Sequence, residues 1–150
     1  MMVIDSREKS IEHIERYFKE HNIEYHIEKL DTGDYMNTDN RDVIVDRKRS
    51  LDECAQNLYS ADSSRFWREL RRAHESRIKL IFLVEHGNGI NCFDDVIAWN
   101  SKYSAKVTGK QVANEMFKTH VAYGVDWLFC QRQNTAQRIL ELLKYDGRGE

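Results

Sequence analysis

Residues 43–52 read VIVDRKRSLD, and they join the end of one predicted strand to the start of one predicted helix. The β-branched residues at 43–45 favour a strand, and charged side chains follow them directly. Ser50 stands three residues before Glu53, which is the spacing of a capping box at a helix N-terminus. A strand that only had to reach water could end on glycine, asparagine or serine. The dense charge at this strand end therefore indicates a functional role.

Strands and helices alternate along the rest of the chain. Alternating or continuous apolar residues predict strands at 1–4, 24–30, 34–37, 43–48, 80–85 and 125–130. Apolar residues three or four apart predict helices after the caps Ser10 and Ser50, from Ser63 or Ser64 to about Arg77, and at 93–103, 110–123 and 135–145. This order predicts one α/β domain with a central mixed β-sheet flanked by helices.

The composition limits the class of protein. Hydrophobic residues make up 41% and charged residues 32% of the 150 residues, which is typical of a soluble globular chain. The net charge of −2 means that a nucleic-acid partner has to be met by a local basic patch. No apolar run resembles a signal peptide or a membrane span, and the three cysteines form no CxxC pair. We therefore expect a cytoplasmic, nucleoid-associated or nuclear protein with no membrane partner.

Two aspartates are predicted to meet at one edge of the sheet. Side chains two residues apart in a strand share a face, so Asp46 and Lys48 point one way and Arg47 points the other. If this strand forms a hairpin with the strand before it, Asp34 comes close to Asp46. Two such carboxylates repel each other, and a divalent cation with a preference for oxygen ligands removes the conflict. A lysine beside the pair can orient a water or neutralise charge on a phosphate.

Each of these residues also has a simpler interpretation. An Asp-x-Lys pair at a strand end is often a solvent-exposed ion pair of little energetic consequence. Asp52 could serve only the N-terminus of its helix, and Gly33 could be only a turn residue. In either case a strand end lies at the surface, so we expect Asp34 and Lys48 to lie outside the core.

A longer pattern is more specific. Gly33-Asp34, eleven residues, Asp46-Arg47-Lys48, three residues and then Asp52 resemble the GD–ERK–xxx–D signature of the XPF/Hef family of structure-specific endonucleases. Residues 5–8, read DSRE, are similar to the D-x-R-E opening of that family. Tyr123-Gly124-Val125 and Thr135-Ala136 are similar to later family segments, so the resemblance covers roughly residues 2–145.

The resemblance implies a restriction-endonuclease-like PD-(D/E)XK nuclease core and a metal-dependent DNA endonuclease acting on flapped, forked or branched duplexes. Asp34 and Asp46 would bind Mg²⁺ or Mn²⁺, together with the carbonyl of Arg47. Lys48 would position the attacking water and stabilise charge on the phosphate. Asp5 and Asp52 would act around this site or on a second metal.

Two arginines and a basic helix are left with open roles. Arg7 and Arg47 suit either a phosphate or an internal ion pair, for example of Arg7 with Asp34 or Asp52. The segment 64–79 carries six basic residues against only Glu69 and Glu75, so it could follow a DNA backbone or form a solvated helix face. The predicted DNA-binding residues are Arg49, Arg65, Arg68 and Arg72.

Departures from the family leave further questions. The motif glutamate is Asp46 here, which shortens the side chain by one methylene. No helix-hairpin-helix pair is found, so we expect residues 1–150 to form a single nuclease domain, and the sequence leaves open whether a partner protein supplies junction recognition. The family pairs its nuclease domains, which predicts a homodimer through Val112, Met116, Phe117, Ile139 and Leu143. The alternatives are a resolvase or other nuclease of the same superfamily, or a non-catalytic DNA-binding or scaffolding relative.

Overall fold

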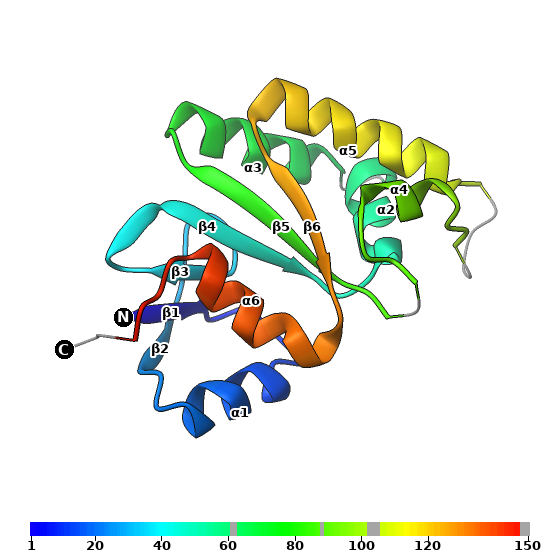
Figure 1. The fold of residues 1–150 in the computed structure, drawn as a ribbon. Coiled ribbons are helices and arrows are strands. Elements are labelled where there is room, and N and C mark those ends of the chain that lie inside the picture. The colour runs from blue at the N-terminus through cyan, green and yellow to red at the C-terminus, as the bar shows by residue number, and fades with distance from the viewer. Residues whose placement is uncertain (61–62, 88, 102–105, 148–150) are drawn as a thin grey trace.

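Six strands form one mixed sheet in the order β2-β1-β3-β4-β5-β6, so the predicted α/β class is confirmed (Figure 1). The computed structural model describes residues 1–60, 63–87, 89–101 and 106–147. The strands are β1 (Met2–Asp5), β2 (Tyr25–Glu28), β3 (Tyr35–Asn37), β4 (Asn40–Lys48), β5 (Lys79–Glu85) and β6 (Asp126–Cys130). The helices are α1 (Glu12–Glu20), α2 (Leu51–Tyr59), α3 (Ser63–Glu75), α4 (Phe93–Ile97), α5 (Gly109–Tyr123) and α6 (Thr135–Leu142), with a 3-10 turn at Arg132–Asn134.

The strand directions bring several strand ends to one edge of the sheet. β3 is antiparallel to both β1 and β4, and β4, β5 and β6 are parallel to one another. The carboxyl ends of β1, β4 and β5 therefore lie together with the start of β3. The charged residues that follow these strands in the sequence are collected at this edge.

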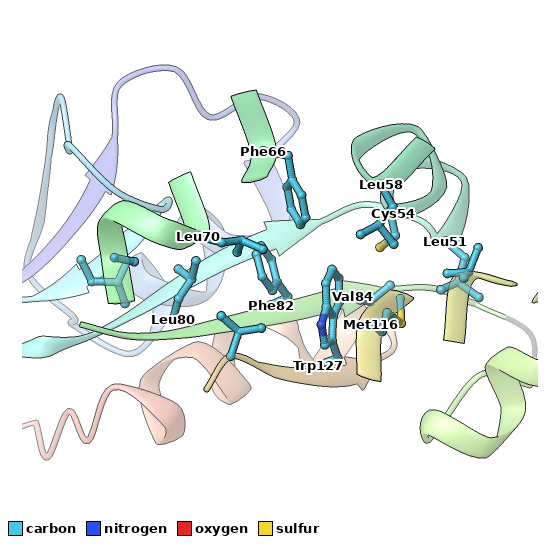
Figure 2. Close-up of a cluster of buried hydrophobic side chains, with 14 of the residues drawn as sticks. Leu51, Cys54, Leu58, Phe66, Leu70, Leu80, Phe82, Val84, Met116 and Trp127 are labelled. Carbon is cyan, nitrogen blue, oxygen red and sulfur yellow. The ribbon is translucent and has the colours of Figure 1, made fainter. Parts of the chain in front are cut away.

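Helices cover both faces of the sheet. Helices α3 and α5 pack on one face and α1 and α6 on the other (Figure 1). Phe66 and Leu70 of α3 lie against Leu80, Phe82 and Trp127 in the first core cluster (Figure 2). Each large apolar side chain buried in this way contributes about 1.5–3 kcal/mol. The strongly basic helix α3 is thus fixed to the sheet by its apolar stripe.

Some local predictions were wrong. Ser10 does not cap α1, because it adopts a positive φ of 56° and Ile11 occupies the cap position without a side-chain hydrogen bond. Helix α4 ends at Ile97, and the end of the helix predicted at 93–103 lies outside the described residues at Tyr103. Ser50 does cap α2, since its hydroxyl accepts a hydrogen bond from the Glu53 N–H at 3.2 Å.

None of the helices in the described ranges has the length and apolar character needed to span a bilayer.

Candidate active site

A cavity of about 430 Å³ opens at the edge where β1, β4 and β5 end. All of its lining residues except Gly33 are charged. The acidic ones are Asp5, Glu8, Asp31, Asp34, Asp46, Glu53 and Glu69, and the basic ones are Arg7, Lys9, Arg47, Lys48, Arg49, Arg65, Arg68 and Arg72. Every predicted site residue except Asp52 therefore lines one cavity.

The hairpin of β3 and β4 brings Asp34 to Asp46. Tyr35 pairs with Val45 in antiparallel register, and the Asp34 N–H donates to the Val45 carbonyl at 2.9 Å. Gly33 makes the turn before Asp34 with a φ of +68°, and a Cβ there would lie 2.3 Å from Ile44 Cγ2. Only glycine fits this position without displacing Ile44. The turn therefore fixes where Asp34 enters the cavity.

The carboxylates of Asp34 and Asp46 repel each other. Burial, together with the negative charges of Asp46 and Glu8, raises the pKa of Asp34 well above its usual value. The N–H of Arg47 donates to Asp34 Oδ2 at 2.9 Å and offsets only part of this effect. The charge of ionised Asp34 is therefore unfavourable at this position, and binding of either a proton or a cation relieves it.

Lys48 is buried, so the prediction that it lies at the surface was wrong. Asp46 is 6% and Lys48 8% exposed, because α3 covers this end of β4. Lys48 Nζ lies 3.3 Å from Asp46 Oδ1. Burial opposes the charge of Lys48, but the carboxylate of Asp46 outweighs it, and the pKa of Lys48 lies above its usual value. The pair is therefore a buried cation beside a carboxylate and not a solvated surface ion pair.

Arg47 points to the opposite face of β4, as the alternation predicts. Its Nε donates to Glu8 at 2.9 Å, its Nη1 to Glu85 at 3.1 Å and its Nη2 to the Lys9 carbonyl at 2.6 Å. Its side chain is 0% exposed, so the internal ion pair is the alternative that the geometry supports. Glu85 is held in turn by His13 Nε2 at 2.8 Å and by the Thr135 hydroxyl at 2.6 Å.

Asp5 braces Arg7 at the rim of the cavity. Asp5 accepts hydrogen bonds from Arg7 Nε at 3.0 Å and Nη2 at 3.1 Å, and from the N–H of Leu30 at 2.8 Å. Burial would raise the pKa of Asp5, but the hydrogen bonds from Arg7 and the backbone lower it overall. The partner of Arg7 is thus Asp5, and the predicted partners Asp34 and Asp52 were wrong. Arg7 remains 62% exposed in its side chain and faces the cavity.

Asp52 lies outside the cavity. Its Oδ1 accepts a hydrogen bond from the Ser101 hydroxyl, and it lines a different hollow beside Tyr59 and Val107. Glu53, one position further along α2, lines the charged cavity instead. The geometry does not support the predicted role of Asp52 around the reacting atoms or on a second metal.

Two glutamates of the cavity were not among the predicted site residues. Glu8 accepts hydrogen bonds from the Tyr35 hydroxyl at 2.7 Å and from Arg47, and Glu69 accepts one from the Gly33 N–H at 3.2 Å. Burial and the charge of Asp46 raise the pKa of both carboxyls. One sequence signal existed for Glu69, because it shares a helical face with Arg65 and Arg72.

The predicted DNA-binding arginines form the outer rim. Arg49, Arg65, Arg68 and Arg72 are exposed, and all four line the cavity. The three on α3 lie at spacings of three and four residues, so they share one face of the helix. An acidic floor is thus bordered by a basic rim.

The donor set fits a hard divalent cation. Among the residues that the structure describes, no three acidic, histidine or cysteine side chains converge on one metal position. Mg²⁺ usually takes only one or two carboxylates and completes its shell with water and phosphate. Asp34 is half-buried and Asp46 is buried, and both carboxylates line the same cavity. They therefore meet that requirement.

Comparisons with known proteins identify the family and the fold of this chain. A family model described as the ERCC4 domain matches residues 4–143. XPF from Aeropyrum pernix has a similar fold, with a TM-score of 0.72, 18% sequence identity and 99% coverage of this chain. XPF from the same organism in complex with DNA matches with a TM-score of 0.69, 18% identity and 98% coverage. This chain spans 65% and 64% of the length of those two chains. No curated protein matched the sequence.

Proposed function

Since this chain belongs to the ERCC4 domain family and has an XPF-type nuclease domain, we propose that it is a metal-dependent DNA endonuclease that hydrolyses a phosphodiester in flapped, forked or branched duplexes. One observation carries the proposal. Asp34, Asp46 and Lys48 meet in a single cavity whose rim is formed by arginines. A non-catalytic DNA-binding relative would have no need for this combination.

Asp34 and Asp46 would hold Mg²⁺ or Mn²⁺. When bound, the cation supplies Lewis-acid stabilisation of charge on the phosphate. The Lys48 ammonium donates to the attacking water or to a phosphate oxygen, where negative charge increases in the transition state. The water oxygen bonds to phosphorus in line with the ester bond that breaks, the water releases one proton to solvent, and the leaving oxygen takes up a proton. Arg47 keeps Asp34 in place through its N–H and contacts no substrate.

The basic rim would bind the DNA backbone. Arg49, Arg65, Arg68 and Arg72 offer guanidinium groups that suit phosphate oxygens, and such contacts carry no sequence information. Arg7, which Asp5 orients, adds a further guanidinium group to the lining of the cavity. We propose the cytoplasm with its nucleoid, or the nucleus, as the place of action.

A panel of substrates tests the function. Purified protein is incubated with flap, fork, four-way and linear duplexes of one sequence, with and without Mg²⁺. We expect cleavage near the branch of flaps or forks and little cleavage of linear duplex. Preference for the four-way substrate would instead support a resolvase, and binding without cleavage would support a scaffolding protein. Equal binding to branched and linear DNA would assign junction recognition to a partner protein.

Metal dependence gives a second test. We expect Mg²⁺ or Mn²⁺ to be required, and Mn²⁺ to support faster cleavage, because it tolerates the geometry imposed by the short Asp46 side chain. Ca²⁺ should bind without supporting cleavage. The measurement is the initial rate on one fork at equal concentrations of each ion, with binding of Ca²⁺ followed by calorimetry. Full cleavage in excess EDTA would contradict the proposal.

We also propose a homodimer, through a surface that keeps only Phe117 of the five predicted contacts. Val112, Met116, Ile139 and Leu143 are 0% exposed within one chain, so these four predicted contacts were wrong. Phe117 remains, at 58% exposed, with Val121 at 69% one turn further along α5. A hollow of about 230 Å³ is lined by Phe117 and by Trp127 and Leu128 of the edge strand β6. A second copy would cover this apolar face.

Light scattering at tens of micromolar is expected to give twice the monomer mass of 17.8 kDa. Phe117→Arg should give a monomer, because it places a charge in the centre of the covered face. Ile27→Arg is the matched control, since Ile27 is 53% exposed on β2 at the other end of the sheet. A monomeric wild type, or dissociation by both variants, would count against this interface.

A further inference from the structure

Two aromatic rings lie against the ammonium group of Lys48. Its Nζ is 5.6 Å from the ring centroid of Phe66 and 5.5 Å from that of Phe82. A cation over a ring face within about 6 Å of the centroid is attracted by the quadrupole of the ring. We propose that Phe66, together with Phe82, is a positioning residue that holds the Lys48 ammonium in the cavity. This inference rests on the proposed nuclease function.

The fold explains why the rings meet the lysine. Lys48 shares a face of β4 with Asp46 and Ile44, and Phe82 is the partner of Asp46 across the β4–β5 ladder. Phe66 comes from α3, which packs on that same face, and its ring centroid is 5.4 Å from that of Phe82 (Figure 2). The two rings therefore belong to the core and lie against Lys48 without lining the cavity themselves.

The attraction of the two rings for the ammonium group of Lys48 does not depend on whether the carboxylates bind a metal. Asp46 Oδ1 lies 3.3 Å from Lys48 Nζ and draws the ammonium towards itself. If Asp46 also holds a divalent cation, part of its charge is shared and its attraction for Lys48 weakens. The ring faces bind no divalent cation here and keep their attraction for the ammonium. Phe66 and Phe82 would thus keep Lys48 in place when the site is in use.

Ordinary core packing is the competing explanation, because both rings are buried, at 5% and 0% exposed. The two explanations separate when the electrostatics of the ring changes at nearly constant shape. Mono-, di- and trifluorinated phenylalanines weaken the negative face of the ring stepwise while the side chain remains apolar. Phe66 is the better position for them, because Phe82 also stacks on Trp127 with centroids 4.2 Å apart.

Each fluorinated residue is incorporated at position 66 of the full chain, and cleavage of one forked duplex is followed. We expect kcat to fall stepwise, by about three- to tenfold for the trifluorinated ring, on the scale of a desolvated cation–π contact. DNA binding in EDTA should stay within about twofold, because the rings do not contact the rim. The same series at Phe18, a fully buried ring of the α1 and α6 side, is the matched control and should leave kcat unchanged.

A second measurement needs neither metal nor activity. In the metal-free protein, ring currents from Phe66 and Phe82 should shift the NMR signals of the Lys48 Cε–H₂ group, and Phe66→Leu should move them towards their position in an unstructured peptide. A kcat that does not change along the fluorinated series, or Lys48 signals without a ring-current shift, would overturn the inference. If the wild type cuts no DNA at all, the proposed function fails, and the NMR signals alone decide the position of Lys48.

Discussion

Asp34→Asn is expected to abolish cleavage and at the same time to make the metal-free protein more stable at neutral pH. Cleavage should disappear because a carboxylate oxygen that would bind the cation is replaced by an amide. Loss of a residue that merely orients a metal ligand costs about 10–100-fold in metal affinity. Loss of the ligand itself should cost at least as much.

The gain in stability follows from the raised pKa of Asp34. The pKa of this carboxyl is higher in the folded than in the unfolded chain. The folded protein therefore becomes less stable as the pH rises through the pKa of the folded state. Asparagine stays neutral, so the variant escapes that loss, and the difference should vanish at acidic pH. The amide oxygen can still accept the hydrogen bond that the N–H of Arg47 donates.

Thermal unfolding in EDTA and in Mg²⁺ tests both effects. Wild type should gain stability when Mg²⁺ is added, and Asp34→Asn should gain little. In EDTA the variant should melt higher, by about 2–4 °C for each kcal/mol recovered. Asp42→Asn makes the same chemical change at an exposed position of β4 and should alter neither cleavage nor the response to Mg²⁺. A variant that still cuts would remove Asp34 from the metal site.

Lys48→Ala is expected to lower turnover by about 10²-fold or more, which is the usual effect of removing one preorganised electrostatic donor. Binding of a forked duplex should change little, because one contact is a small part of a multi-phosphate footprint. Stability should move in the direction opposite to Asp34→Asn. The loss of the buried ammonium leaves the buried carboxylate of Asp46 without its ion-pair partner, at a cost of about 3–5 kcal/mol.

Lys48→Met provides a second variant in case the alanine variant folds poorly. It keeps an apolar stem against Phe66 and Phe82 and removes only the charge. Lys79→Ala is the control, since Lys79 pairs with Asp126 at 3.1 Å at the other end of β5. Cleavage rate, binding in EDTA and unfolding temperature are measured for all three. Cleavage at the wild-type rate by Lys48→Met would defeat the proposed mechanism, even though the family assignment stands.

Local patterns predicted the parts of the site that depend on local geometry. The twofold period of a strand is enough to place Asp46 and Lys48 on one face and Arg47 on the other, and the structure has them so. The hairpin that brings Asp34 to Asp46 spans few residues, and its pairing follows from two adjacent strands. The mixed sheet with helices on both faces was predictable for the same reason, from the order of the elements.

Contacts between distant segments could not be predicted in this way. A helix turns about 100° per residue, so the side chain of α2 that faces the cavity depends on how α2 packs against α3. The sequence therefore favoured Asp52, whereas the structure places Glu53 there. Burial of Lys48 could not be predicted for the same reason. It requires Phe66 of α3 to pack against β4, and α2 lies between these two elements in the sequence.

The alternation along β4 has a consequence for insertions and deletions. One residue added between Ile44 and Asp46 would turn every later side chain to the opposite face. Arg47 would then point into the cavity, and Asp46 and Lys48 would point towards α1 and α6. The hairpin tip between Asn37 and Asn40 lies at the end of β3 and β4 that is opposite the cavity. Extra residues there change no pairing near Asp34. Natural length variation in this hairpin should therefore gather at the tip and be absent from the last five residues of β4, Ile44–Lys48.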